Sequence, residues 1–145
     1  LKMKNNNYLV LLFSCIFILF CSCKSKPCTE IKYNYYTEII NDFKNGLFLD
    51  VELDNTVFIF TGKITGIQYP VYKDKKNPCT VFFGLPQGYH GPDIYNYIAV
   101  EMKSYIDQSY IEKEISIIGK YKKLFNHDNV LQIILNDGEV ISHQY

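Results

Sequence analysis

The chain has 145 residues and carries 15 basic and 15 acidic side chains, so its formal net charge at pH 7 is zero. All fifteen cations are lysines, which argues against nucleic acid as a partner, because phosphate binding usually needs a basic excess and arginine is the commonest reader of guanine. Alanine occurs only at Ala99, whereas isoleucine, tyrosine and phenylalanine are plentiful, and this favours a sheet over a helical bundle.

The first part of the chain has the pattern of a secretory signal. Lys2 and Lys4 precede an uncharged apolar run from Tyr8 to Phe20. The run is shorter than the roughly 20 residues that span a bilayer and matches the about 7–15 residues of a signal-peptide core. A buried N-terminal core helix is the alternative. We expect residues 1–22 to be a signal peptide.

Three cysteines then crowd into the stretch FCSCKSKPC, and Ser22 precedes Cys23. This arrangement resembles the lipobox of bacterial lipoproteins, in which a small residue precedes the cysteine that is modified. The resemblance implies that Cys23 is lipidated and that the lipid holds the protein on the membrane of the bacterial cell envelope. Lys24 in place of aspartate favours the outer membrane by the same resemblance. Residues 23–30 are then the lipidated cysteine and a short tether.

Two further cysteines, Cys28 and Cys79, would remain as thiols in an oxidising compartment. A disulfide between them would close a long loop and stabilise the fold. Two separate thiols are the alternative, because Cys28 lies in the expected tether.

Residues 31–145 are expected to form one domain. Ile31, Tyr35, Ile39 and Phe43 recur every four residues, which predicts an amphipathic helix over about 30–45. The following acidic alternation at 50–54 resembles the start of a calcium loop but lacks its glycine and its glutamate, so no metal site is expected there. Strands are predicted over 56–67, 79–85, 95–102, 114–124 and 130–135, with a short helix over 103–111 and a tight turn at Asp137-Gly138.

This order of elements is that of the OB-fold, a five-stranded Greek-key barrel. Two apolar strands run into Gly62-Lys63 and Gly119-Lys120, as the first and fourth strands of small OB domains do. The chain resembles a family of envelope lipoproteins whose domain is similar to the tRNA-anticodon-binding OB-fold. The resemblance implies a mainly β domain with a leading helix, a five-stranded barrel and a short helix between strands three and four. The Asp137-Gly138 turn departs from a simple fifth strand.

Motifs of catalysis are missing from the sequence. Lys63 is not part of a phosphate loop, and neither GxSxG nor HExxH occurs. The three histidines, His90, His127 and His143, are scattered over turns and the tail, where solvated side chains are usual. We therefore expect no enzyme activity, no metal and no cofactor.

The resemblance places a ligand on the face of strands two and three and on the loops that flank it. Aromatic side chains beside lysines can stack on bases or sugars, although aromatic residues abound throughout this chain and loop lysines are usually solvated. The candidate ligand-binding residues are Tyr69, Tyr72, Lys73, Tyr95, Tyr97, Lys122, Phe125 and His127.

Two functions follow as expectations. The first is a membrane-anchored, non-catalytic binding module for an envelope protein or an oligosaccharide. The second is an inhibitor or immunity-type lipoprotein that binds a secreted protein. Without residues 1–22 the chain keeps thirteen lysines against fifteen acids, so a nucleic-acid partner is not expected.

Overall fold

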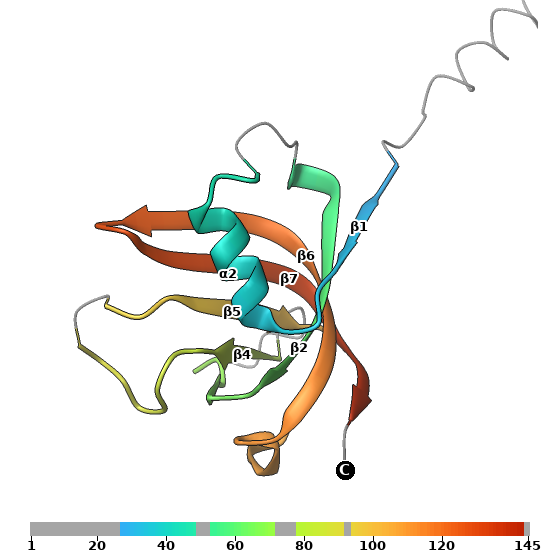
Figure 1. The fold of residues 1–145 in the computed structure, drawn as a ribbon. Coiled ribbons are helices and arrows are strands. Elements are labelled where there is room, and N and C mark those ends of the chain that lie inside the picture. The colour runs from blue at the N-terminus through green and yellow to red at the C-terminus, as the bar shows by residue number, and fades with distance from the viewer. Residues whose placement is uncertain (1–26, 49–52, 72–77, 92–93, 144–145) are drawn as a thin grey trace, which may run out of the picture.

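The computed structural model describes residues 27–48, 53–71, 78–91 and 94–143. These residues form a mainly β structure, one mixed seven-stranded sheet with the strand order β1-β2-β6-β7-β5-β4-β3, accompanied by one α-helix (Figure 1). The strands are β1 Thr29–Lys32, β2 Thr56–Lys63, β3 Gly66–Gln68, β4 Cys79–Phe83, β5 Tyr97–Met102, β6 Glu114–His127 and β7 Val130–His143. The predicted signal peptide, the predicted lipidation site Cys23 and the acidic pair Asp50 and Glu52 lie outside the described residues.

The predicted first strand is bent into two parts. β2 pairs antiparallel with β6, whereas β3 pairs antiparallel with β4. Only Ile64 and Thr65 separate the two parts, and their amides bond in opposite directions, to Lys113 O at 3.0 Å and to Phe82 O at 2.8 Å. The chain therefore runs through β3, β4 and β5 as a meander and returns in β6 beside β2, which is a Greek-key connection.

The two longest strands, β6 and β7, form an antiparallel hairpin. Asp128 and Asn129 close it with φ values of 50° and 67°, the left-handed conformation that short polar side chains tolerate in tight hairpin turns. Figure 1 shows that this hairpin reaches beyond the neighbouring strands. On its other side β7 pairs in parallel with β5.

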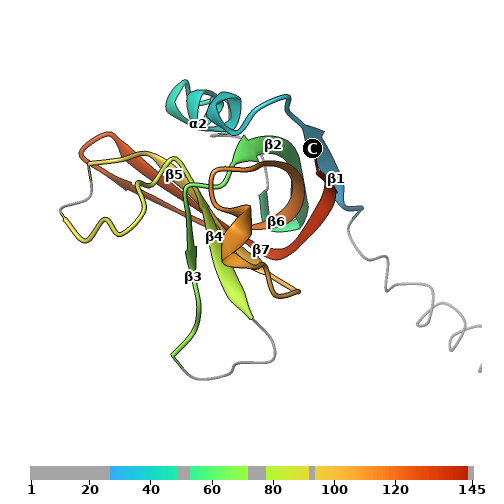
Figure 2. The same ribbon diagram turned by 90° about the horizontal axis from the view of Figure 1, so that it is seen from below.

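The predicted N-terminal helix is confirmed, but it starts later than expected. α2 spans Tyr36–Lys44, and Gly46 follows it at φ 73°, the left-handed conformation that often ends helices. Residues 29–32 form β1 instead, a strand that pairs in parallel with the start of β2. Figure 2 shows α2 lying on one side of the curled sheet.

The core lies between the sheet and α2. Side chains in β2 alternate between buried and half-buried, as expected for a strand with one face on a core. Ile39 and Ile40 of α2 are buried with them, and Tyr36 and Phe43 pack against the same cluster. The largest fully buried side chains include Phe58, Phe60, Phe83, Ile98, Met102, Ile115, Ile117, Ile133 and Leu135.

The expected five-stranded closed barrel is wrong in strand number and in closure, because the described strands form a seven-stranded order with β1 and β3 at its ends. The expected helix over 103–111 is only a 3₁₀ turn, η2 at Gln108–Tyr110. Asp107 starts this turn by accepting a bond from the Ser109 amide at 2.9 Å. The predicted turn at Asp137-Gly138 lies inside β7, where the pairing with β5 shifts register.

In the described ranges no helix is long and apolar enough to cross a membrane.

Candidate functional site

The side of the sheet that faces away from the core carries an aromatic row. Tyr97 of β5 is in register with Gln132 of β7, and Gln132 is in register with Phe125 of β6. Residues in register lie on the same face of a sheet, so the three side chains form one line across three strands. Phe82 of β4 adds a fourth group, because its ring centroid lies 5.9 Å from that of Tyr97 at an interplanar angle of 66°.

A polar row runs beside the aromatic row on the same face. Gln68 of β3 pairs with Thr80 of β4, and Thr80 pairs with Glu101 of β5. Lys122 of β6 reaches across β7 and donates to Glu101 Oε1 and Oε2 at 2.6 and 2.7 Å. We name these two rows together the exterior face.

The Lys122–Glu101 pair makes the polar row electrically neutral. Both side chains are partly open to solvent, so the pair adds little to stability because water screens it. Its effect on recognition is larger, because the cation and the anion neutralise each other within the polar row.

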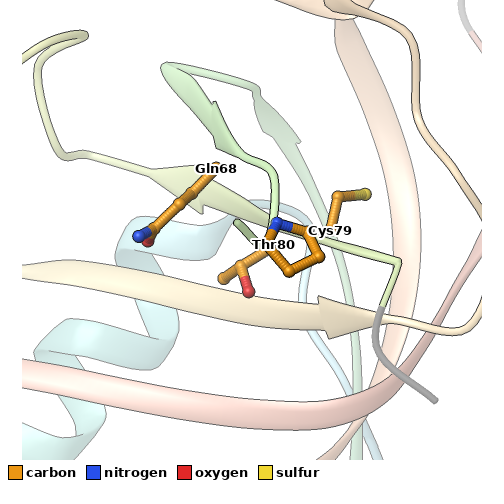
Figure 3. A pocket seen from close by; sticks show the side chains of 4 residues that line it. Gln68, Cys79 and Thr80 are labelled. Atoms are coloured by element: carbon orange, nitrogen blue, oxygen red, sulfur yellow. The ribbon is translucent and has the colours of Figure 1, made fainter. Parts of the chain in front are cut away.

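A shallow hollow lies at the end of the polar row, lined by Gln68, Pro70, Cys79 and Thr80, with a volume of about 210 Å³. Figure 3 shows the side chains of Gln68 and Thr80 on one side of the strand and that of Cys79 pointing away from them. The hollow therefore offers an amide and a hydroxyl.

The thiol of Cys79 belongs to the core. Only 1% of the residue is exposed, and its Sγ lies 3.7 Å from Ser104 O. Burial raises the pKa of the Cys79 thiol above its ordinary value. Cys28 is exposed, and both cysteines are free thiols in the structure, which is the alternative of two separate thiols and not the disulfide.

A loop precedes β5 at the edge of the exterior face. Within it the rings of Tyr89 and Tyr95 meet edge to face with centroids 4.8 Å apart, and Ile94 is 58% exposed. Asn96 fixes the end of this loop to the start of β7, because its Oδ1 accepts a bond from the Leu131 amide at 2.9 Å.

The structure brings together some of the predicted ligand residues. Tyr97, Lys122 and Phe125 lie on the exterior face, but Lys122 is neutralised by Glu101. Tyr95 lies in the loop at its edge. His127 lies at the tip of the β6–β7 hairpin, where its Nδ1 is 3.0 Å from a carboxylate oxygen of Asp128.

Tyr69 makes contacts within the domain. Its hydroxyl donates to Ile106 O at 2.6 Å, and its ring stacks on Tyr105 with centroids 5.2 Å apart. It fastens the segment after β3 to the segment after β5. The other two predicted residues of this segment, Tyr72 and Lys73, lie outside the described residues.

Sequence reasoning missed several members of the exterior face. The alternation inside β4 marks Thr80 and Phe82 as the outer side chains, and this signal was present in the sequence. The placement of Gln68, Glu101 and Gln132 depends on the pairing between strands, which no local pattern gives. Among the described residues, no three His, Cys, Asp or Glu side chains are arranged to hold a metal ion.

Comparison with known proteins gives a structural likeness and no family. No family model and no curated protein matches the chain. Among solved structures, one match is a chain described as an aspartyl-tRNA synthetase from Leishmania major Friedlin, with 8% sequence identity and a TM-score of 0.35. The match covers 85% of this chain and 22% of that chain.

Proposed function

We propose that this chain is a lipid-anchored, non-catalytic binding module of the bacterial cell envelope, and that it binds through the exterior face. The observation that carries the proposal is the aromatic row of Phe82, Tyr97 and Phe125 beside a self-neutralised polar row. Aromatic side chains on the outer surface of a sheet supply contact area at low entropic cost. The polar row supplies orientation.

The strand connections support an OB-like fold for this module. If β2 and β3 are counted as one bent strand, the strands neighbour one another in the order first, second, third, fifth and fourth. The third and fifth strands of this count, β5 and β7, are parallel. OB-folds place their ligands on the face of strands two and three, which correspond here to β4 and β5.

The position of β1 in the domain supports an anchored domain with an accessible face. β1 begins at Thr29, six positions after the predicted lipidation site Cys23. In both ribbon views β1 and the turn of the β6–β7 hairpin lie on opposite sides of the domain (Figures 1 and 2). A domain held at β1 thus has its hairpin and the neighbouring loop directed away from the anchor.

Anchoring is tested in cells. Intact-mass analysis of the membrane fraction is expected to show a chain that begins at Cys23 with added acyl mass, and Cys23→Ala is expected to move the protein out of that fraction. A purified native chain that keeps residues 1–22, or wild-type protein in the cytosol, would refute the anchor.

Binding through the exterior face is tested by capture from envelope extract. The wild-type chain and a Tyr97→Ala variant are compared, with Thr37→Ala on the exposed side of α2 as the control. Loss of the captured component with Tyr97→Ala alone supports the proposal. Equal capture by all three proteins contradicts it.

One observation favours the inhibitor as a second candidate. The β6–β7 hairpin projects from the domain (Figure 1). Phe125 near its tip is 47% exposed, and Ile94 in the loop before β5 is 58% exposed. Exposed apolar side chains near the end of a hairpin suit contact with a secreted protein. Recovery of a secreted toxin or hydrolase in the capture experiment would favour this candidate.

A further inference from the structure

We propose that the ligand of the exterior face is an uncharged oligosaccharide, with one sugar ring in the hollow beside Gln68 and Thr80 and the next rings on Phe82 and Tyr97. This inference rests on the proposed binding module and names its ligand class.

The charges of the face favour an uncharged ligand. Lys122 is held by both carboxylate oxygens of Glu101. The ammonium group of Lys123 lies 4.5 Å from the ring centroid of Phe125, where the ring attracts it. An anionic chain would compete with these partners for each cation and would be repelled by Glu101, whereas a neutral chain leaves the pair intact.

The chemistry of the two rows favours a sugar over a protein. The fully buried centre of a protein interface is usually apolar and poor in charged residues, but here the Lys122–Glu101 pair forms half of the polar row. Sugar rings have apolar faces and a rim of hydroxyl groups. The rings of Phe82 and Tyr97 match the faces, and the amide of Gln68 and the hydroxyl of Thr80 can donate to or accept from the rim.

The dimensions of the site favour a chain of several rings. The hollow of about 210 Å³ is smaller than the roughly 300–1,000 Å³ of typical small-molecule sites, so it holds one ring. Phe82 follows Thr80 by two positions on β4, about 7 Å along the strand. Tyr97 lies on the neighbouring strand β5, two positions beyond Ala99, which is the residue opposite Phe82, and its ring centroid is 5.9 Å from that of Phe82. A ligand that leaves the hollow along β4 meets both aromatic rings in turn.

The test uses the full chain purified in detergent and titrated by calorimetry. The probes are three neutral hexasaccharides (maltohexaose, cellohexaose and chitohexaose) and an acidic hexamer of galacturonic acid. At least one neutral probe is expected to bind, with an affinity that does not fall as salt is raised, and the acidic probe is expected to bind more weakly. Preferred binding of the acidic probe overturns the inference.

Three variants locate the site. Thr80→Val removes the hydroxyl of the hollow at constant shape, and Phe82→Leu removes the aromatic ring but keeps an apolar side chain. Each is expected to weaken neutral-sugar binding at least tenfold, whereas Thr37→Val, the same change on exposed α2, is expected to have no effect. If Phe82→Leu does not fold, as judged by circular dichroism, Thr80→Val decides alone. Unchanged binding by Thr80→Val overturns the inference.

The outcomes separate this inference from the proposed function. Capture of a protein that depends on Tyr97, without binding of any neutral probe, overturns the sugar ligand but leaves the binding module standing. If no neutral probe binds and no capture depends on the exterior face, both the sugar ligand and the binding module are refuted.

Discussion

The hydroxyl of Tyr33 donates a hydrogen bond to Asp42 Oδ2 at 2.6 Å, and the ring of Tyr33 stacks on Phe58 with centroids 6.3 Å apart. One side chain thus joins the segment after β1 to α2 and to β2. Tyr33→Phe keeps the ring but removes the donor to a carboxylate. We expect the free energy of unfolding to fall by about 1–2 kcal/mol, measured by urea denaturation.

Tyr95→Phe is the control for this change, because Tyr95 is 37% exposed in a loop. It is expected to leave the urea midpoint nearly unchanged. An equal loss of stability in both variants would mean that the bond between Tyr33 and Asp42 is not what holds α2.

Several tyrosines make the fold sensitive to alkali. Burial raises the pKa of Tyr33, Tyr36, Tyr69 and Tyr121 above the ordinary value of 10.0, and for Tyr33 the bond to Asp42 raises it further. The folded chain therefore keeps protons that the unfolded chain loses above pH 10. Their contribution to stability is complete below pH 10 and is lost as the pH rises above it.

We accordingly expect the urea midpoint to be steady around pH 8 and to fall as the pH passes about 10. Tyr33→Phe should reduce the steepness of this fall, because it removes one of the shifted groups. A midpoint that stays constant up to pH 11 would contradict the assignment.

Two glycines on the bent strand should differ in their tolerance of a side chain. A Cβ at Gly62 would lie 2.7 Å from Phe83 Cδ1 and 3.0 Å from Tyr36 Cδ1, whereas the nearest atom to a Cβ at Gly66 is 3.9 Å away. Gly62→Ala is expected to destabilise the fold by about 1–3 kcal/mol, because Phe83 is buried and cannot move freely.

Gly66→Ala serves as the matched control and should be close to neutral. Thermal unfolding followed by circular dichroism measures both variants. The packing argument fails if Gly66→Ala costs as much as Gly62→Ala.

The thiols of Cys28 and Cys79 should react at very different rates. Cys28 is exposed and Cys79 is buried, and the raised pKa of Cys79 keeps its thiol protonated and unreactive. With a chain that starts after Cys23, a thiol reagent such as Ellman's should label one cysteine at once and the second only in denaturant. Cys28→Ser should abolish the fast phase.

The same titration without reductant also examines the disulfide. Two titratable thiols in protein purified without reductant would agree with the free cysteines of the structure. No titratable thiol before reduction would instead establish the bridge between Cys28 and Cys79.

The sequence predicts the strands well where their side chains alternate. β2 and β6 start at the expected residues, Thr56 and Glu114, because one face of each is apolar and buried, but the first predicted strand continues as β3 and β6 extends to His127. β1 could not be predicted, because Ile31 fits the helical spacing that continues with Tyr35. The four residues of β1 form a strand only through their pairing with residues 56–59. A short parallel strand at an edge is decided by its partner and not by its own residues.

The candidate site could be predicted only in part for the same reason. The parallel pairing of Tyr97 with Gln132 joins segments far apart in the chain, so the aromatic row follows from topology. Lys122 was expected to be available for a ligand, but the structure pairs it with Glu101. Tyr69 was expected among the ligand-binding residues, and in the structure its hydroxyl donates a hydrogen bond to the Ile106 carbonyl.

The parallel pairing of β1 with β2 also has a mechanical consequence. The chain enters the domain at Thr29 and runs alongside Thr56 in the same direction. A force transmitted from the N-terminal side acts along this strand. It loads the four β1–β2 residue pairs at the same time and does not break them one after another. The pairing of β1 with β2 thus distributes a pulling force over four residue pairs before the force reaches the core.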